Sequence, residues 1–316
     1  MLGHPIHTLP AGNPERSIMR SLIHLSSTSF LRALILASGV LVGTPLVPAE
    51  ARAQVRPDIP DPSDTIYEVR LSDGTVTFAR LVAVDKEKVV LTTIAGGRLE
   101  IERSHIVGLR QAAGEVVNGE FWNEDPSSSR LFFTATGRTL RQGESYLGTY
   151  LFVFPFGAYG FTDRIMIGAG APVLLGHAEP FYVAPKVLLV DGPRARISLG
   201  TLALFFDDER VGIVYGVGTF GSTDEAVSAG IGYFYDGDDL KNNPAFMFGG
   251  EIRTDRRIKL ISENYILPER AGLIFSGGIR VIGDRIATEV AIVATASEGD
   301  SWCCLPLLNF TYAPGN

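Results

Sequence analysis

The stretch VGIVYGVGT, residues 211–219, carries the pattern that decides the fold. Val211, Ile213, Tyr215 and Val217 alternate with three glycines and a valine. Because successive side chains of a β-strand point to opposite faces, this spacing predicts a strand with one large apolar face and one small face.

Segments of this kind recur about twelve times between Arg130 and Tyr312, each followed by a turn. Behind an export signal, such repetition is typical of an antiparallel membrane β-barrel, with apolar side chains toward lipid and small or polar ones toward the lumen. We therefore predict an all-β, up-and-down barrel of about twelve strands, within a range of about 10–14, over 126–316. The expected strands are 130–137, 146–160, 163–173, 181–190, 194–205, 210–220, 225–235, 245–253, 257–266, 272–281, 285–295 and 305–312.

The connections between these segments alternate between longer and shorter ones. The odd-numbered ones, beginning with 138–145 and 174–180, are longer, and the even-numbered ones, such as 191–193, are short. Outer-membrane barrels have an even strand count, short periplasmic turns and longer outer loops. The pattern therefore predicts that both ends of the barrel lie in the periplasm.

Aromatic residues gather near the expected strand ends, as in the girdles of membrane barrels. Pro155, Pro172 and Pro185 fall inside expected strands and argue against closure, because a closed sheet has no free edge for them. A soluble periplasmic or secreted β-sandwich that acts as a binding module therefore stays open as an alternative.

The chain begins with features of a secretory signal peptide, which we expect over 1–53. An apolar stretch at 31–47 leads to Ala-Arg-Ala at 51–53, a small-x-small cleavage site. Either Met1 or Met19 is compatible with the start of translation. The protein is therefore expected to be exported to the outer membrane, or to the periplasm or medium if no barrel forms.

A linker at 54–65 and a small β domain at 66–112 follow the expected cleavage site. Turns at Asp73-Gly74 and Gly96-Gly97 divide the domain into five expected strands: 66–71, 75–84, 89–93, 97–101 and 106–109. This rhythm resembles a small SH3-like or Sm-like barrel. Because an exported module of mixed charge is a poor RNA binder, we expect a periplasmic protein or cell-wall partner for it.

The large domain resembles a bacterial family of exported proteins of unknown function. The resemblance rests on Ser129-Arg-Leu-Phe-Phe133, Gly143-Glu144, Tyr159-Gly160 with Thr162-Asp163, and Ser262-Glu-Asn264. It implies an envelope protein of β-barrel type and supplies no activity and no catalytic residue.

The composition excludes several kinds of chemistry. The formal net charge of −7 and the lack of a basic stripe argue against nucleic-acid binding. Only His105 and His177 remain after residue 53, so we expect no metal site, no cofactor and no catalytic residue. The G-x-G repeats at 168–170, 216–218 and 230–232 lie within expected strands, so we interpret their glycines as lumen-facing and not as nucleotide loops.

The two cysteines of the chain, Cys303 and Cys304, are adjacent, which excludes a disulfide framework. We expect them to be small apolar residues near a loop. His105 is expected to lie in a solvated turn.

Charged residues of both signs occur on the expected inner face of the barrel. A charge that faces hydrocarbon at mid-depth costs about 2–4 kcal/mol for Arg or Lys, so these side chains are expected to point inward and pair. The candidate lumen network consists of Lys186, Arg196, Glu251, Arg253, Lys259, Glu263, Arg280 and Glu289. Arg138, Thr139 and Glu144, in the first connection, are placed to reach the barrel mouth or to cap the first hairpin.

Three functions remain compatible with these features. The favoured one is a non-enzymatic outer-membrane barrel in contact with lipid, structural or passive-transport-like, whose charges fill or line the lumen. The second is the soluble sandwich. The third is an outer-membrane lipid-modifying enzyme, which would need catalytic residues on the outer face or at the rim and which the scarcity of histidines disfavours. Within the lumen, catalysis by a carboxylate pair such as Glu263 and Glu289 would have to proceed without a nucleophile or a histidine partner.

Overall fold

The computed structural model describes residues 59–172, 180–206, 209–268, 272–297 and 300–314. The expected signal peptide at 1–53 and the first part of the linker lie outside these ranges. Within them, no helix is long and apolar enough to cross a membrane.

Five strands of the small domain form one antiparallel sheet in the order β4-β3-β2-β1-β5. Alternating apolar residues build its core, in which Val69, Val89 and Leu91 are fully buried. The strands are β1 (Ile66–Leu71), β2 (Val76–Val84), β3 (Lys88–Thr93), β4 (Arg98–Glu102) and β5 (Ile106–Gln111). His105 is exposed in the short 3₁₀ turn η1 (Arg103–His105). The SH3-like or Sm-like character of the domain stays a prediction.

A short hairpin of β6 (Gly114–Val117) and β7 (Glu120–Asn123) follows the small sheet. Its turn contains Asn118 and Gly119, both with positive φ, a conformation that these two residue types adopt most readily.

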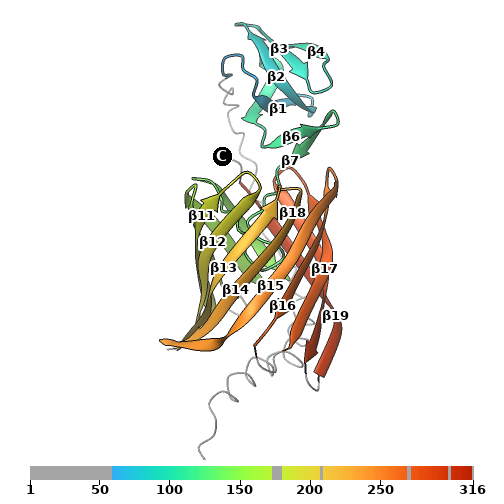
Figure 1. The fold of residues 1–316 in the computed structure, drawn as a ribbon. Coiled ribbons are helices and arrows are strands. Elements are labelled where there is room, and N and C mark those ends of the chain that lie inside the picture. Colours follow the sequence, from blue (N-terminus) through green and yellow to red (C-terminus); the bar gives the residue numbers. More distant parts are fainter. Residues whose placement is uncertain (1–58, 173–179, 207–208, 269–271, 298–299, 315–316) are drawn as a thin grey trace, which may run out of the picture. The chain divides into compact units, whose positions relative to one another are not determined.

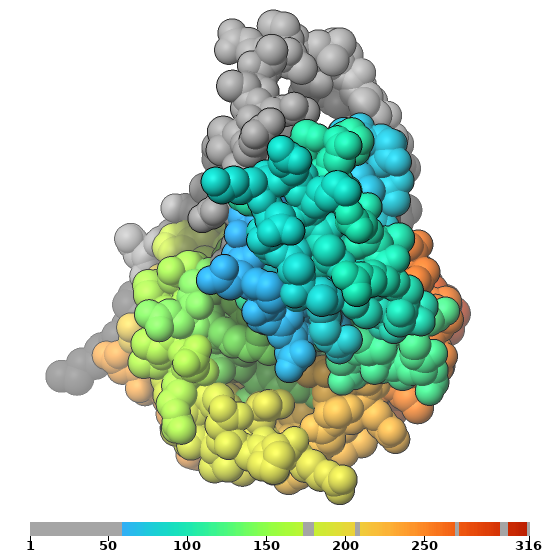
Figure 2. All heavy atoms as spheres, turned by 90° about the horizontal axis from the view of Figure 1, so that it is seen from above, coloured from blue at the N-terminus to red at the C-terminus, as the bar shows by residue number. Residues whose placement is uncertain are grey.

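The large domain is a closed antiparallel barrel of twelve strands, each paired with its neighbours in the chain, with β19 against β8 to close the ring. Figure 1 shows the tilted strands, and the end-on view in Figure 2 shows their colours running from green through yellow to orange around the molecule. The strands are β8 (Ser145–Tyr150), β9 (Phe154–Thr162), β10 (Ile165–Gly170), β11 (Phe181–Asp191), β12 (Ala195–Phe206), β13 (Glu209–Gly221), β14 (Glu225–Asp236), β15 (Asp239–Asp255), β16 (Ile258–Ile266), β17 (Leu273–Ile282), β18 (Ile286–Ser297) and β19 (Asp300–Tyr312).

The strand number agrees with the sequence-based prediction, although two of the expected segments are wrong. The segment 130–137 is not a barrel strand, and the expected strand 146–160 is two strands, β8 and β9. The chain reverses at 151–153, where Leu151 and Phe152 adopt positive φ. Large apolar residues rarely adopt this conformation, so no turn signal was visible in the sequence.

The barrel has two rims. β8 begins and β19 ends at the same one, here called the proximal rim, which also carries the turns 163–164, 192–194, 222–224, 256–257 and 283–285. The opposite end is the distal rim. Several distal connections are shorter than expected: β14 and β15 extend to Asp236 and Asp239, so a tight turn replaces the long loop expected between 235 and 245.

The outer wall is apolar, with aromatic side chains near both rims. Leu199, Ile231 and Val290 are among its exposed residues between the rims. Exposed aromatic residues lie near the proximal rim at Tyr159, Phe161, Phe220, Phe310 and Tyr312, and near the distal rim at Phe152, Phe181 and Phe246.

The prolines do not prevent closure. Pro155 lies at the start of β9, Pro172 lies beyond the end of β10, and Pro185 lies within β11 opposite Ile167. No pairing with β12 occurs at Pro185, while the register continues on both sides of it. A closed barrel, and not a sandwich, therefore forms.

The two faces of β13 are reversed relative to the prediction. Val217 is buried on the lumen side, in one cluster with Leu131 and Phe132. Gly216 and Gly218 lie on the outer face, where a Cβ would meet the side chains of Leu199 and Phe220 at 3.2 and 3.3 Å. The large apolar face of this strand therefore points into the lumen, where it packs against Leu131 and Phe132.

A plug in the barrel lumen

Residues 125–140, here called the plug, are enclosed by the barrel wall instead of forming part of it. Leu131, Phe132 and Thr136 have no exposed surface, and Arg130 and Arg138 are each only 4% exposed. The plug reverses direction once: Arg130 pairs with Ala135 in an isolated bridge, and the Leu131 N–H donates to the Thr134 carbonyl at 2.9 Å. Further main-chain bonds lie within the plug, such as that from the Thr136 N–H to the Ser129 carbonyl at 3.0 Å. The main-chain groups that these bonds leave free need partners on the wall.

Glu263 of β16 accepts hydrogen bonds from the tip of the plug. Its carboxylate is fully buried and receives the main-chain N–H groups of Phe132, Phe133 and Thr134 at 2.6, 3.1 and 3.3 Å. The Tyr265 hydroxyl donates to the same carboxylate. Consecutive N–H groups that converge on one anion form a nest, so the partners of Glu263 are largely main-chain dipoles.

Lys186 of β11 donates hydrogen bonds to main-chain carbonyls of the plug. Its buried ammonium donates to the carbonyls of Ser129 at 3.0 Å, Thr136 at 3.1 Å and Arg138 at 2.5 Å. Across the described part of the chain, neither Lys186 nor Glu263 has an ion-pair partner within 4.0 Å. Each is satisfied by plug polypeptide, which removes the large cost of an unpaired buried charge.

Arg280 of β17 contacts main-chain carbonyls of the plug and a carboxylate of the wall. Its guanidinium donates to the carbonyls of Ser127, Arg130 and Leu131 at 3.3, 3.2 and 2.6 Å. It also pairs with Glu289 at 2.6 Å. The planar fork of arginine suits several fixed acceptors at once.

Asp125 anchors the proximal end of the plug between two wall cations. Its carboxylate lies 2.6 Å from Lys259 Nζ and 2.7 Å from Arg280 Nη1, and all three groups are buried. Lys259 also pairs with Glu251 at 3.0 Å. Burial raises the pKa of the Asp125 carboxyl, but Arg280 and Lys259 lower it by more, so the net pKa lies well below its usual range.

Two plug arginines complete the network. Arg130 pairs with Glu289 of β18 at 3.0 Å and donates to the Thr311 hydroxyl at 2.7 Å. Arg138 pairs with Glu251 of β15. Both carboxylates therefore hold one cation from the plug and one from the wall, because Arg280 and Lys259 are their wall partners.

Apolar and close main-chain contacts seat the rest of the plug. Leu131 and Phe132 pack against buried wall residues that include Val217 and Met247. Gly137 lies so close to β12 that a Cβ would fall 2.2 Å from the Arg196 carbonyl oxygen. The Gly137 N–H donates to the Thr219 hydroxyl at 2.8 Å, so only glycine fits at this point.

Six of the eight predicted lumen residues lie together around the plug: Lys186, Glu251, Lys259, Glu263, Arg280 and Glu289. The side chains of the other two form their ion pairs with residues outside the plug. Arg253 pairs with Asp224 at 3.0 Å and donates to the Asn123 carbonyl at 2.9 Å. Arg196 is only half-buried and pairs with Asp191 at 2.9 Å.

The partners missed by the sequence-based prediction are Asp125, Arg130 and Arg138 of the plug. Arg138 was expected at the barrel mouth or as a cap of the first hairpin, because it lies in a connection between expected strands, but its pairing with Glu251 was not foreseen. Of the other two residues noted there, Thr139 donates to the Asp163 carbonyl at 3.0 Å, and Glu144 accepts from the Arg141 N–H at 2.8 Å. These two fix the exit of the plug into β8.

The plug engages both carboxylates that the sequence suggested for acid–base chemistry. Glu263 and Glu289, the pair considered for acid–base chemistry, are each occupied by hydrogen-bond donors of the plug. In the part of the chain that the structure describes, no group of three or more His, Cys, Asp or Glu residues is placed to hold a metal ion.

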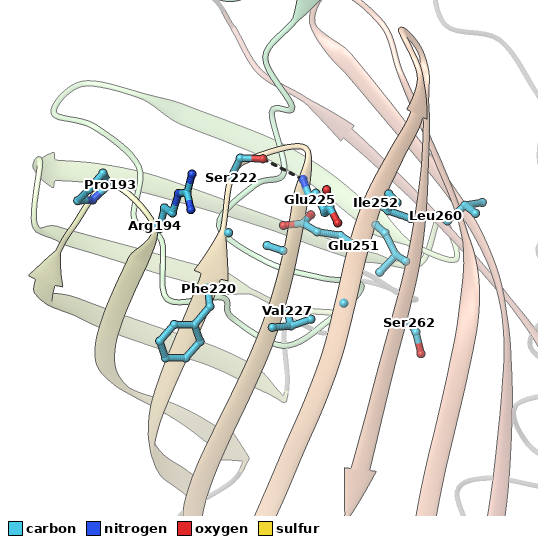
Figure 3. Close-up of a pocket in the computed structure, with 14 residues that line it drawn as sticks. Pro193, Arg194, Phe220, Ser222, Glu225, Val227, Glu251, Ile252, Leu260 and Ser262 are labelled. Atoms are coloured by element: carbon cyan, nitrogen blue, oxygen red, sulfur yellow. Dashed lines mark hydrogen bonds between the residues drawn. The ribbon is translucent and has the colours of Figure 1, made fainter.

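A groove of about 920 Å³ lies on the outer wall across β13 to β16. Figure 3 shows Arg194, Ser222 and Glu225 toward its end at the proximal rim, with Phe220 and Val227 further along the strands. The groove is thus apolar along the wall and charged at the rim.

Cys303 and Cys304 are joined by a disulfide, so the expectation that they are merely small apolar residues is wrong. They lie near a connection, as expected, with exposed side chains toward the distal end of β19.

The fold and the lumen define the class of this protein: a closed antiparallel β-barrel of twelve strands with an internal plug. No protein-family model and no curated protein matches the chain. A loop-deletion mutant of OmpT, an outer membrane protein of Vibrio cholerae, matches with a TM-score of 0.32 and 12% identity, over 79% of this chain and 95% of that one. Outer-membrane expressed OmpT of the same organism gives 0.29 and 14%, over 79% and 94%.

Proposed function

We propose that this chain is a non-enzymatic outer-membrane barrel, closed at rest by its own plug and able to conduct solutes only when the plug is displaced. The observation that carries the proposal is the plug itself, which is seated on six buried wall charges. Twelve strands enclose a narrow interior that side chains can largely fill, so a resident segment is enough to close it.

The outer surface supports a location in lipid. The exposed apolar band and the aromatic residues near both rims match the features of membrane barrels. The groove in Figure 3 would contact acyl chains along the wall, with Arg194 and Glu225 near headgroup level. Because both barrel ends lie at the proximal rim, that rim and the small domain would be periplasmic.

The engagement of the two candidate carboxylates by hydrogen-bond donors supports the non-enzymatic part of the proposal. Glu263 and Glu289 are both saturated with donors. A lipid-modifying enzyme would require a free acid, base or nucleophile near the membrane. Unchanged acyl chains in the lipids of a gene-deletion strain would agree with the proposal, whereas altered chains would contradict it.

The small domain at 66–112 would act in the periplasm as a binding module for an envelope protein or the cell wall. Its separate core, formed around Val69, Val89 and Leu91, supports an independent module. Pull-down of envelope fractions with the full-length protein, compared with a variant lacking 66–111, tests this assignment.

Planar-bilayer conductance of the purified full-length protein tests closure. We expect little current from the wild type and stepwise current when 126–140 is replaced by a short Gly-Ser linker. Heat-modifiable gel migration controls for folding of the variant. Equal current from both folded proteins would overturn the assignment of 125–140 as the closing element.

A further inference from the structure

The wall recognises the plug mainly through its main chain. Glu263 accepts hydrogen bonds from three consecutive N–H groups, Lys186 donates to three carbonyls, and Arg280 donates to three more. Ser198 and Thr219 bind the carbonyl and the N–H of Gly137, both at 2.8 Å. These groups form hydrogen bonds to the main chain of the plug, as a peptide-binding site does to its ligand.

Three plug side chains add specificity to this main-chain recognition. Asp125 lies between Lys259 and Arg280, Arg130 pairs with Glu289, and Arg138 pairs with Glu251. Their spacing fixes the register of the plug along the lumen. Between them, Phe133 at the tip is 46% exposed and makes its contact with Glu263 only through its main chain.

From these contacts we propose that the lumen is a polypeptide-binding site, which the plug occupies in cis. The ligand class is a hairpin peptide with an acidic residue at its start, arginines five and thirteen positions later, and glycine one position before the second arginine. The inference rests on the proposed function, because it names what the lumen binds once the plug has moved. The plug is then an autoinhibitory ligand that a matching exported peptide displaces.

Two exposed turns allow the plug to be excised from the folded, full-length protein. Protease recognition sequences are inserted at the Asn118–Gly119 turn and next to Gln142, both of which are exposed. After folding in detergent, cleavage at both sites converts the plug into a free peptide that only non-covalent contacts retain. We expect it to co-elute with the barrel in gel filtration and to exchange with a labelled synthetic peptide of residues 125–140.

Modified peptides separate main-chain from side-chain recognition. N-methylation at Phe132 and Phe133 removes two donors to Glu263 and keeps every side chain, and we expect at least about tenfold weaker binding. The matched control is Phe133→Tyr, which keeps both main-chain donors and the ring that packs on Tyr150, and should bind within about twofold of the parent. Equal binding of the N-methylated and parent peptides would overturn main-chain recognition.

The remaining outcomes are also decisive. A barrel that loses heat-modifiable migration when the peptide leaves would show that the plug belongs to the core, and the proposal would fall. Failure of the labelled peptide to bind a folded, emptied barrel would overturn it as well. Conductance of the same cleaved sample reports separately on closure: current from an emptied barrel that rejects the peptide would leave the proposed function standing without this inference.

Discussion

At the scale of single residues, the barrel buries full charges, and groups of the plug form hydrogen bonds or ion pairs with them. Glu263 and Lys186 are the extreme cases, because main-chain groups supply most of their partners. Isolated buried charges are among the most costly features a protein can contain. The plug and the wall therefore depend on each other for stability.

Glu263→Ala tests this dependence. The substitution leaves one buried and two partly buried N–H groups without their acceptor. We therefore expect the free energy of unfolding to fall by about 3–5 kcal/mol. Urea unfolding in detergent, followed by gel migration, gives the measurement, and Glu263→Gln should lose less because its amide oxygen can still accept. Unchanged stability together with altered conductance would instead favour a role in an ion or ligand path.

Asp125→Asn tests the acid dependence of the anchor. The pKa of Asp125 is lowered in the folded state, so its stabilising contribution is complete above the unfolded pKa of about 4 and is lost as the pH falls toward the folded pKa. We expect wild type to exceed Asp125→Asn in stability at pH 7, and the difference to shrink between about pH 5 and pH 2. Asp61→Asn, in the exposed linker, is the control, and a pH-independent difference would contradict the assignment.

At the scale of elements, the plug shows how a local pattern can mislead. Residues 130–137 mix apolar and polar positions like the true strands, and their alternation predicted a strand. Their charged partners lie on β11, β16, β17 and β18. Alternation is a local property, whereas a position inside the ring depends on strands far away in the chain.

Gly137→Val tests the seating of the plug as an element. The new Cβ would fall 2.2 Å from the Arg196 carbonyl, so the plug must shift, and we expect a loss of about 1–3 kcal/mol or more with increased conductance. Gly277→Val is the matched control, because a Cβ at Gly277 meets nothing within 4 Å. Identical bilayer recordings for the two variants would count against a tightly seated plug.

At the scale of the whole molecule, one surface feature separates a membrane barrel from a soluble one. Leu199→Arg places a charge on the outer wall between the rims, which costs about 2–4 kcal/mol in hydrocarbon and almost nothing in water. Leu240→Arg, near the distal rim, should cost about 0–1 kcal/mol. Stability measured in lipid vesicles should follow this order, and equal effects would point to a soluble barrel.

Cell fractionation provides the parallel test of location. We expect the protein to stay in the membrane fraction after a carbonate wash and to migrate differently on gels before and after heating. Release into the soluble fraction would remove the outer-membrane assignment while leaving the fold unchanged.

By itself, the sequence determined the parts of this protein that depend on neighbours along the chain. Two-residue alternation and turn residues predicted all five strands of the small sheet and most of the barrel strands, and the placement of charges between apolar residues marked the inner face at Lys259, Glu263 and Arg280. Only the tertiary structure decided that β13 turns its large residues inward and that 125–140 fills the ring. Both outcomes depend on contacts between 125–140 and wall residues that are distant in the sequence. Only closure of the ring brings these groups together.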